Sequence, residues 1–180
     1  MQIARAARGK ANQVRSTSDL SSVFYAEYPR LWSIAYAMLG DRQHAEEVVM
    51  DAFVRAFSSW PRLVRLDYPP GYLRKIVVNL CRSKLRRRSV ELRVNALAHR
   101  REERYGPPWE SGSSDLRMDV LAALAELSPM QRACAVLRYF DDMTETQIAG
   151  VLDCSVGTVK SHIFRARKTL GKALGSETEG

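Results

Sequence analysis

The chain has 180 residues, 46% hydrophobic and 27% charged, which is the composition of a folded globular protein and excludes a mostly disordered chain. Its 28 lysines and arginines outnumber its 20 aspartates and glutamates. The resulting formal charge of +8 favours an anionic partner such as nucleic acid or an acidic membrane surface. The apolar runs fall well short of the roughly 18 residues that cross a bilayer, and residues 1–18 lack the apolar stretch of a secretory signal. We therefore expect a cytoplasmic protein.

The N-terminal half carries three apolar stripes in which residues recur at spacings of three and four, so it predicts three helices. The first stripe is Leu20, Phe24, Tyr28, Leu31, Ile34 and Ala35; the second is Ala45, Val48, Val49, Ala52, Phe53, Ala56 and Phe57; the third is Tyr72, Leu73, Ile76, Val77 and Leu80. Residues 71–88, around the third stripe, contain seven basic residues and no acidic one. This segment is therefore a candidate polyanion contact.

Turn-forming residues coincide with low apolar content at 105–114, YGPPWESGSS, which is the best linker candidate. We leave open whether residues 91–104 before it form a weak helix or an ordered connector. The predicted fold is all-α, with two small helical domains joined by a flexible linker. Its parts are a disordered basic tail at 1–18, a first domain at 19–89, a linker at 90–114, a second domain at 115–174 and a tail at 175–180.

The C-terminal half begins with a helical stripe and continues with two capping patterns. The stripe is Val120, Leu121, Leu124 and Leu127. Ser128, with Pro129 after it and Gln131 at the third helical position, predicts a helix start, and Thr144 with Gln147 predicts a second. The helix after Thr144 would turn four residues inward: Ile148, Ala149, Val151 and Leu152.

A final helix should begin at the N-cap Ser155, directly after Asp153, which stands at a turn position where glycine is commonest. Its inner face would be Val156, Val159, Ile163, Ala166 and Leu170. Its outer face would carry hydroxyls and cations suited to the major groove: Thr158, Lys160, Ser161, Phe164, Arg165 and Lys168. A short capped helix, a tight turn, the small crossing residue Ala149 and an acid-free second helix predict a helix-turn-helix.

These segments resemble a known family. TETQIAGVLDCSVGTVKSHIFRARKTL, preceded by ELSPMQRACAVLRYFDDM, is similar to region 4 of the extracytoplasmic-function (ECF) branch of the sigma-70 family, of the actinobacterial SigE-like type. FYAEYPRLWSIAYAMLGDRQHAEEVVMDAFVRAFSSW and YLRKIVVNLCRSKLRRR are similar to region 2. The resemblance implies a dissociable subunit of bacterial RNA polymerase that directs promoter recognition, DNA melting and initiation at a specific regulon. It implies no catalytic residue, no cofactor and no metal.

By the same resemblance, the partners are core RNA polymerase, at its clamp coiled coil and flap, and promoter DNA, with an anti-sigma factor as a further candidate and no membrane insertion. The helix at 45–57 would contact the clamp. Its candidate contacts are Asp41, Glu46, Glu47, Met50 and Asp51, while Val48, Val49, Phe53 and Phe57 would pack inside. Met50 stands where the family usually has glutamine.

The resemblance also assigns the two promoter elements. The third helix and the loop at 61–70 before it would face the minus-10 element, with the loop accepting a flipped base. The candidate contacts there are Arg62, Arg65, Tyr68, Arg74, Lys75, Asn79, Arg82, Lys84 and Arg86. The outer face of the last helix, the six residues from Thr158 to Lys168 given above, would read the minus-35 element.

Two other classes remain as alternatives. A stand-alone helix-turn-helix regulator would share the C-terminal half, but the second basic helix and the absence of a receiver or ligand domain in this sequence argue against it. An enzyme is disfavoured because His44, Glu47 and Asp51 are better explained as a solvated helix face than as metal ligands. The three cysteines, Cys81, Cys134 and Cys154, form no Cys-x-x-Cys pair, and we expect reduced, mostly buried thiols.

Overall fold

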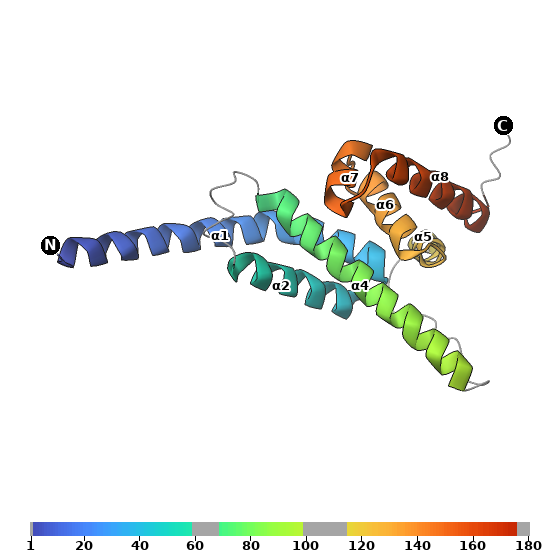
Figure 1. The fold of residues 1–180 in the computed structure, drawn as a ribbon, viewed down its shortest axis with the longest axis horizontal. Coiled ribbons are helices and arrows are strands. Elements are labelled where there is room, and N and C mark those ends of the chain that lie inside the picture. Colours follow the sequence, from blue (N-terminus) through green and yellow to red (C-terminus); the bar gives the residue numbers. More distant parts are fainter. Residues whose placement is uncertain (1, 59–68, 99–114, 176–180) are drawn as a thin grey trace.

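The protein is described by a computed structural model in which residues 2–58, 69–98 and 115–175 are placed, with side chains at 21–58, 71–90 and 118–175. These ranges form seven helices and contain no strand, which confirms the all-α prediction (Figure 1). The helices are α1 (Gln2–Leu39), α2 (Arg42–Ser58), α4 (Pro69–Ala98), α5 (Asp115–Ala125), α6 (Pro129–Tyr139), α7 (Glu145–Leu152) and α8 (Val156–Ala173). Within them, no helix has the length and apolar character that crossing a membrane requires.

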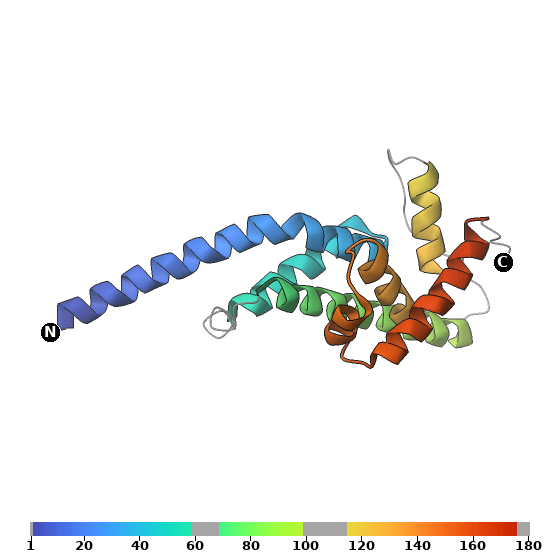
Figure 2. The same cartoon turned by 90° about the horizontal axis from the view of Figure 1, so that it is seen from above.

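The N-terminal half is a three-helix unit made by the C-terminal part of α1 with α2 and α4, which lie against one another in both views (Figures 1 and 2). Its core follows the predicted stripes, because residues three and four apart share one face of a helix. Leu31 and Ile34 of α1, Val49 of α2 and Val77 of α4 are each at most 1% exposed. The opposite end of α1 extends away from the rest of the molecule (Figure 1).

Two segments that we placed outside the domains are helical. The tail at 1–18 was predicted to be disordered, but α1 begins at Gln2. Residues 90–98 were assigned to the linker, with a helix left open for 91–104, and α4 continues to Ala98. Both segments are rich in alanine, arginine, glutamine or leucine, which favour helix, and neither contains proline. The predicted linker therefore begins with the last turns of α4, and residues 99–114 lie outside the described residues.

Helix α4 is buried on two sides rather than one. The predicted stripe covers only one of them, with Leu73 and Val77 fully buried and Tyr72 37% exposed. Val78 and Cys81 are also at 0% exposure; burial of Cys81 was expected, whereas sequence reasoning assigned no burial to Val78. This second side is buried because α6 and α7 of the C-terminal half pack against α4. The two halves therefore form a single closed body.

The helix starts predicted in the C-terminal half are confirmed. Ser128 and Gln131 form a complete capping box at α6, and Thr144 and Gln147 form another at α7. Ser155 caps α8 by accepting a hydrogen bond from the Thr158 amide at 3.1 Å. Between α7 and α8, Asp153 adopts φ 57° and ψ 52°, so it occupies the left-handed turn position normally filled by glycine.

The contribution of these N-caps to stability can be tested directly at Thr144. Replacing Thr144 with alanine is expected to lower the free energy of unfolding by about 1 kcal/mol, because the Gln147 amide loses its acceptor at the start of α7. Replacing Thr146, exposed two residues later inside the same helix, with alanine is the matched control and should leave stability unchanged or slightly higher. Urea titration followed by circular dichroism separates the two. Equal losses would show that the cap contributes nothing special.

Candidate nucleic-acid interface

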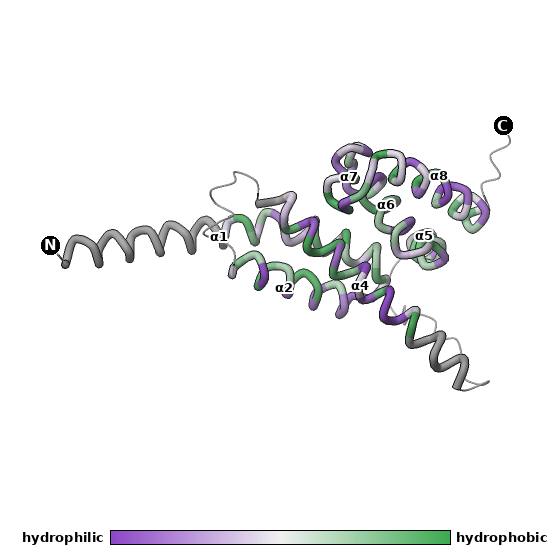
Figure 3. Tube along the Cα trace, in the orientation of Figure 1, coloured by the Kyte–Doolittle hydropathy of each residue, from purple (hydrophilic) through white to green (hydrophobic). Residues whose placement is uncertain are grey.

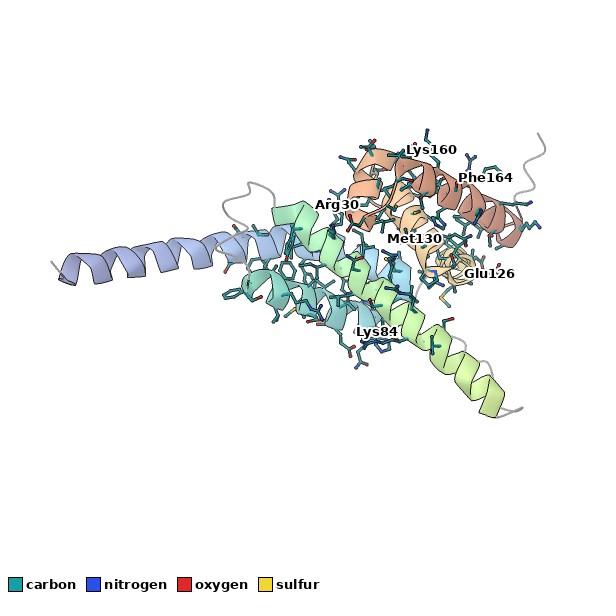
Figure 4. All side chains as sticks on the ribbon, in the orientation of Figure 1. Arg30, Lys84, Glu126, Met130, Lys160 and Phe164 are labelled. Carbon is teal, nitrogen blue, oxygen red and sulfur yellow. The ribbon has the colours of Figure 1, made fainter. Side chains whose placement is uncertain are left out.

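The outer face of α8 is open to solvent and cationic, as predicted. Ser161, Phe164, Arg165 and Lys168 are exposed, with Phe164 at 72%. Figure 4 shows Lys160 and Phe164 projecting from the outer edge of α8, and Figure 3 shows the hydrophilic stretches along the same helix. The inner face carries the buried Val159, Ile163 and Ala166. This separation leaves one continuous surface that can lie in a groove of DNA.

Two predicted α8 contacts are already engaged within the protein. The Thr158 hydroxyl lies 2.9 Å from that of Ser155, so it belongs to the N-cap, and Thr158 is half-buried. Lys160 lies 3.8 Å from Glu145 of α7, with 64% of its side chain exposed. An exposed pair of that length contributes little, so Lys160 is free to turn toward a phosphate, whereas Thr158 is placed to hold the helix start.

Gly157 was missed by sequence reasoning and shares the outer face of α8, four residues before Ser161 and seven before Phe164. A Cβ at this position would meet only Ser155 Oγ at 3.8 Å, so the fold itself has room for a side chain. Because glycine has no side chain, the backbone of the first helical turn is uncovered at this position, where amide groups attract phosphate. The sequence signal that could have identified Gly157 is its place between the N-cap Ser155 and the basic outer face of α8.

Replacing Gly157 with alanine should therefore move stability and DNA binding in opposite directions. The free energy of unfolding is expected to rise by at most about 1 kcal/mol, and duplex affinity to fall roughly threefold to tenfold because a methyl group blocks close approach. Gly150 of α7 is the control, since it is exposed with no atom within 4 Å of a built Cβ. Its replacement should stabilise without weakening binding. A Gly157→Ala protein that binds DNA like the unmodified chain would refute the close approach.

His162 marks the inner edge of this surface. Its pKa is lowered by burial and, more weakly, by the positive charges of Arg165 and Arg82, so it adds no charge near neutral pH. Arg82 belongs to α4, which packs against α6 and α7 of the C-terminal half.

Four of the predicted minus-10 residues form one stripe on α4. Lys75, Asn79, Arg82 and Arg86 are spaced by four, three and four residues, which places them on one face of the helix. Asn79 and Arg86 are exposed, while Lys75 and Arg82 are half-buried. Arg82 donates to the Asn79 side chain at 3.3 Å. Burial lowers the pKa of Arg82, and the positive charge of Arg86 adds to the effect.

The structure separates the remaining minus-10 candidates from that stripe. Arg74 is only 7% exposed and forms an ion pair with Asp141 of the C-terminal half at 2.7 Å. Lys84 turns toward α2 and donates to Glu47 at 2.8 Å (Figure 4). Neither side chain is free to contact a phosphate in this arrangement, so each would first have to be released by its present partner. Arg62, Arg65 and Tyr68 lie outside the described residues.

The acidic face of α2 is mostly where the sequence places it. Glu46, Glu47, Met50 and Asp51 are all exposed, and Asp51 pairs with Arg55 at 3.0 Å within the helix. The hydrogen bond from Lys84 is the main cause that lowers the pKa of Glu47. Asp41 differs, because its side chain accepts from the His44 amide at 2.7 Å and thereby caps the start of α2.

Phe57 was expected to pack inside, but it is 56% exposed. It joins Val54, 66% exposed, and Met50, 45% exposed, in a row along α2. Together with α1 they line a cavity of about 370 Å³. We call this surface the α1–α2 apolar patch; it comprises Phe24, Tyr25, Met50, Phe53, Val54 and Phe57. Exposed apolar side chains gathered in this way are typical of a surface that binds a protein, a membrane or an apolar ligand.

The thiols form no reactive centre. All three cysteines are free; Cys81 and Cys134 are buried and Cys154 is half-buried. Burial raises the pKa of Cys81 and of Cys134 to about 12 each, so both remain protonated and poorly nucleophilic at neutral pH. These thiols therefore behave as small core side chains.

A helix-turn-helix, two cationic helix faces and a separate apolar patch are together typical of a DNA-binding protein that also contacts another protein. Comparison with known proteins then identifies its family. The sequence profile of Sigma-70 region 2 matches residues 24–90, and that of Sigma-70, region 4 matches residues 117–170. The chain belongs to the sigma-70 family, in its extracytoplasmic-function branch.

Individual relatives agree with that assignment. The ECF RNA polymerase sigma factor SigE of Mycolicibacterium smegmatis is 32% identical over 149 residues, which cover 78% of this chain and 56% of SigE. SigW of Bacillus subtilis is 26% identical over 155 residues, covering 81% of this chain and 83% of SigW. The sigma factor RpoE from Bartonella quintana, solved in complex with the anti-sigma factor NepR, superimposes with a TM-score of 0.68 at 26% identity, covering 88% of this chain and 98% of RpoE. The chain thus spans little more than half the length of SigE but most of the other two.

Proposed function

We propose that the chain binds core RNA polymerase and directs promoter recognition, DNA melting and transcription initiation. The unit at 19–89 acts as region 2, and the unit at 115–174 acts as region 4, with residues 90–114 between them. One observation carries the proposal: the chain presents two acid-free cationic helix faces, on α4 and α8, together with an apolar patch on a third surface. A stand-alone regulator needs only one of these three surfaces.

The α8 face is proposed to read the minus-35 element. Arg165 and Lys168 supply cations, Ser161 a hydroxyl and Phe164 an apolar ring for a thymine methyl group. The α4 stripe is proposed to bind the minus-10 element through phosphates and base edges. Arg74 and Lys84 join it only when their present partners release them. The loop residues Arg62, Arg65 and Tyr68 complete this proposed set.

Docking on core polymerase is assigned to α2. The exposed acids Glu46, Glu47 and Asp51 share α2 with the exposed apolar side chains of the patch, so the helix presents charged groups as well as apolar ones to a partner. That combination is the usual anatomy of a protein–protein interface. The clamp coiled coil is the proposed partner of this surface, and the flap that of the C-terminal unit. Asp41 is proposed to act only indirectly, by fixing the start of α2.

The remaining assignments follow from this role. The chain performs no catalysis of its own and uses no cofactor or metal, because the polymerase carries the chemistry. It acts in the cytoplasm, where the polymerase and chromosome are. An anti-sigma factor is a further proposed partner, supported by the RpoE likeness, since that sigma factor was solved with the anti-sigma factor NepR.

Gel filtration of the purified chain mixed with bacterial core RNA polymerase tests the proposal. We expect co-elution with core at micromolar concentrations, whether or not DNA is present. Failure to bind core, combined with tight sequence-specific DNA binding by the chain alone, would support the stand-alone regulator instead. The cationic stripe on α4 would then need another partner.

A further inference from the structure

Asp141 is held by two arginines from the other half of the molecule. It lies between α6 and α7, and its side chain is completely buried. Arg30 of α1 donates from Nε to the Asp141 carboxylate and from Nη2 to the Asp141 carbonyl, the latter at 2.9 Å. Arg74 of α4 lies 2.7 Å from the second carboxylate oxygen. Figure 4 shows Arg30 where the N-terminal half meets the C-terminal half. One carboxylate therefore bridges three elements that are distant in sequence.

Other contacts cross the same boundary, but they differ in kind. Arg132 of α6 donates to the Met38 carbonyl at the end of α1 at 2.8 Å, in a buried position. Lys75 lies 3.9 Å from Asp153, whose side chain is 89% exposed, so this pair contributes little. Asp141 is thus the one acidic side chain among the described cross-boundary contacts that is fully buried. Removing one member of such a buried group is far more disruptive than breaking an exposed pair.

The Asp141 contact removes a cation from the surface that is proposed to bind promoter DNA. Arg74 is 7% exposed, and its guanidinium is ion-paired with a carboxylate, an anion that occupies the position a phosphate would need. The α4 stripe beside it is partly covered as well: Lys75 and Arg82 are half-buried, and Lys75 lies 3.9 Å from Asp153 of the C-terminal half. The outer face of α8 remains open. The closed chain therefore offers one promoter-reading face in full and the other only in part.

We propose that Asp141 is an autoinhibitory residue that takes the place of a promoter phosphate on Arg74 and holds the free chain closed. The inference rests on the proposed function, and it adds a specific intramolecular competitor for the α4 surface. A partner that separates the halves releases Arg74 and uncovers the stripe together. DNA affinity of the free chain is then limited by the fraction that is open.

The test uses two variants that break the contact from opposite sides, in the full chain. Asp141→Asn removes the buried charge at constant size. Arg30→Gln removes its partner, whose side chain is 53% exposed and lies in none of the predicted DNA-binding sets. Asp142→Asn is the matched control, because Asp142 is adjacent and exposed, and asparagine tolerates its positive φ of 50°. Each variant changes the net charge by one unit. The two Asp→Asn changes raise it, and Arg30→Gln lowers it.

Duplex affinity by fluorescence anisotropy and radius of gyration by small-angle X-ray scattering are the readouts, with circular dichroism to verify helix content. Asp141→Asn and Arg30→Gln should bind duplex at least about tenfold more tightly and be more extended, because the first leaves the buried Arg74 without its anion and the second takes one of two cations from the buried Asp141, and both changes disfavour the closed state. The gain for Arg30→Gln is the sharper result, because that variant loses a positive charge. Asp142→Asn should match the unmodified chain.

Folded Asp141→Asn and Arg30→Gln proteins that stay compact, or that open without gaining DNA affinity, would overturn the proposal. Should Asp141→Asn fail to fold, Arg30→Gln decides alone. Core polymerase binding, measured on the same samples, keeps the two claims apart. Loss of core binding by every sample, including the unmodified chain, contradicts the proposed function, whereas normal core binding without a gain in DNA affinity contradicts only the autoinhibition.

Discussion

Replacing Val54 with glutamate is expected to lower the affinity of the chain for core RNA polymerase by about 30-fold or more. Val54 is 66% exposed and lies between Met50 and Phe57 in the α1–α2 apolar patch, so its side chain stabilises no core of the free protein. On docking, the glutamate carboxylate would be transferred from water into an apolar contact, which is unfavourable. Truncating a central interface residue of this kind typically costs about 2 kcal/mol or more of binding free energy. Quantitative gel filtration or surface plasmon resonance against core measures the loss.

Val90→Glu is the matched control for that experiment. Val90 is 58% exposed on α4 and does not line the patch, so it introduces the same charge on a comparably exposed valine. We expect its core affinity to stay close to that of the unmodified chain, and both variants to unfold at the same urea concentration as the parent. Equal losses of affinity for Val54→Glu and Val90→Glu would mean that net charge, rather than the patch, governs docking.

Replacing Arg165 with alanine is expected to lower discrimination between matched and scrambled upstream elements by about 5- to 150-fold, the range that a bidentate arginine–guanine contact supplies. Arg165 is exposed on the outer face of α8, and burial of Val159, Ile163 and Ala166 on the other side fixes that orientation. Competition binding of holoenzyme to the two DNA fragments at one salt concentration gives the ratio directly.

Arg167→Ala separates base reading from charge. Arg167 is also exposed on α8 and carries the same charge, but two residues along a helix point in opposite directions. Its loss should weaken binding to both fragments alike and reduce the salt dependence, as expected for a phosphate contact. The assignment of Arg165 fails if its replacement weakens matched and scrambled fragments equally.

The features that sequence predicts well are those set by neighbours along the chain. The caps at Ser128, Thr144 and Ser155 depend on residues three positions away, and all three form as predicted. The two sides of α8 follow from one period of 3.6 residues. The chain's membership of the sigma-70 family also follows from these segments, because the region 4 match covers the helix-turn-helix that the spacing predicts.

What sequence leaves out depends on contacts between distant segments. Val78 is buried because the C-terminal half covers α4, and no local period of α4 signals that second face. Arg74 is paired with a carboxylate 67 positions further along the chain, so its removal from the surface has no local sign. Phe57 has the spacing of a core residue, yet it lies on the patch, at the last turn of α2.

The central claim is tested most directly by measuring promoter melting on genomic fragments by core polymerase, with and without the chain. Permanganate reactivity of unpaired thymines is the readout. We predict no melting with core alone or with the chain alone, and melting at a limited set of fragments when both are present. Sequence-specific protection by the chain alone, with no melted region when core is added, would contradict a role in initiation and identify a stand-alone regulator.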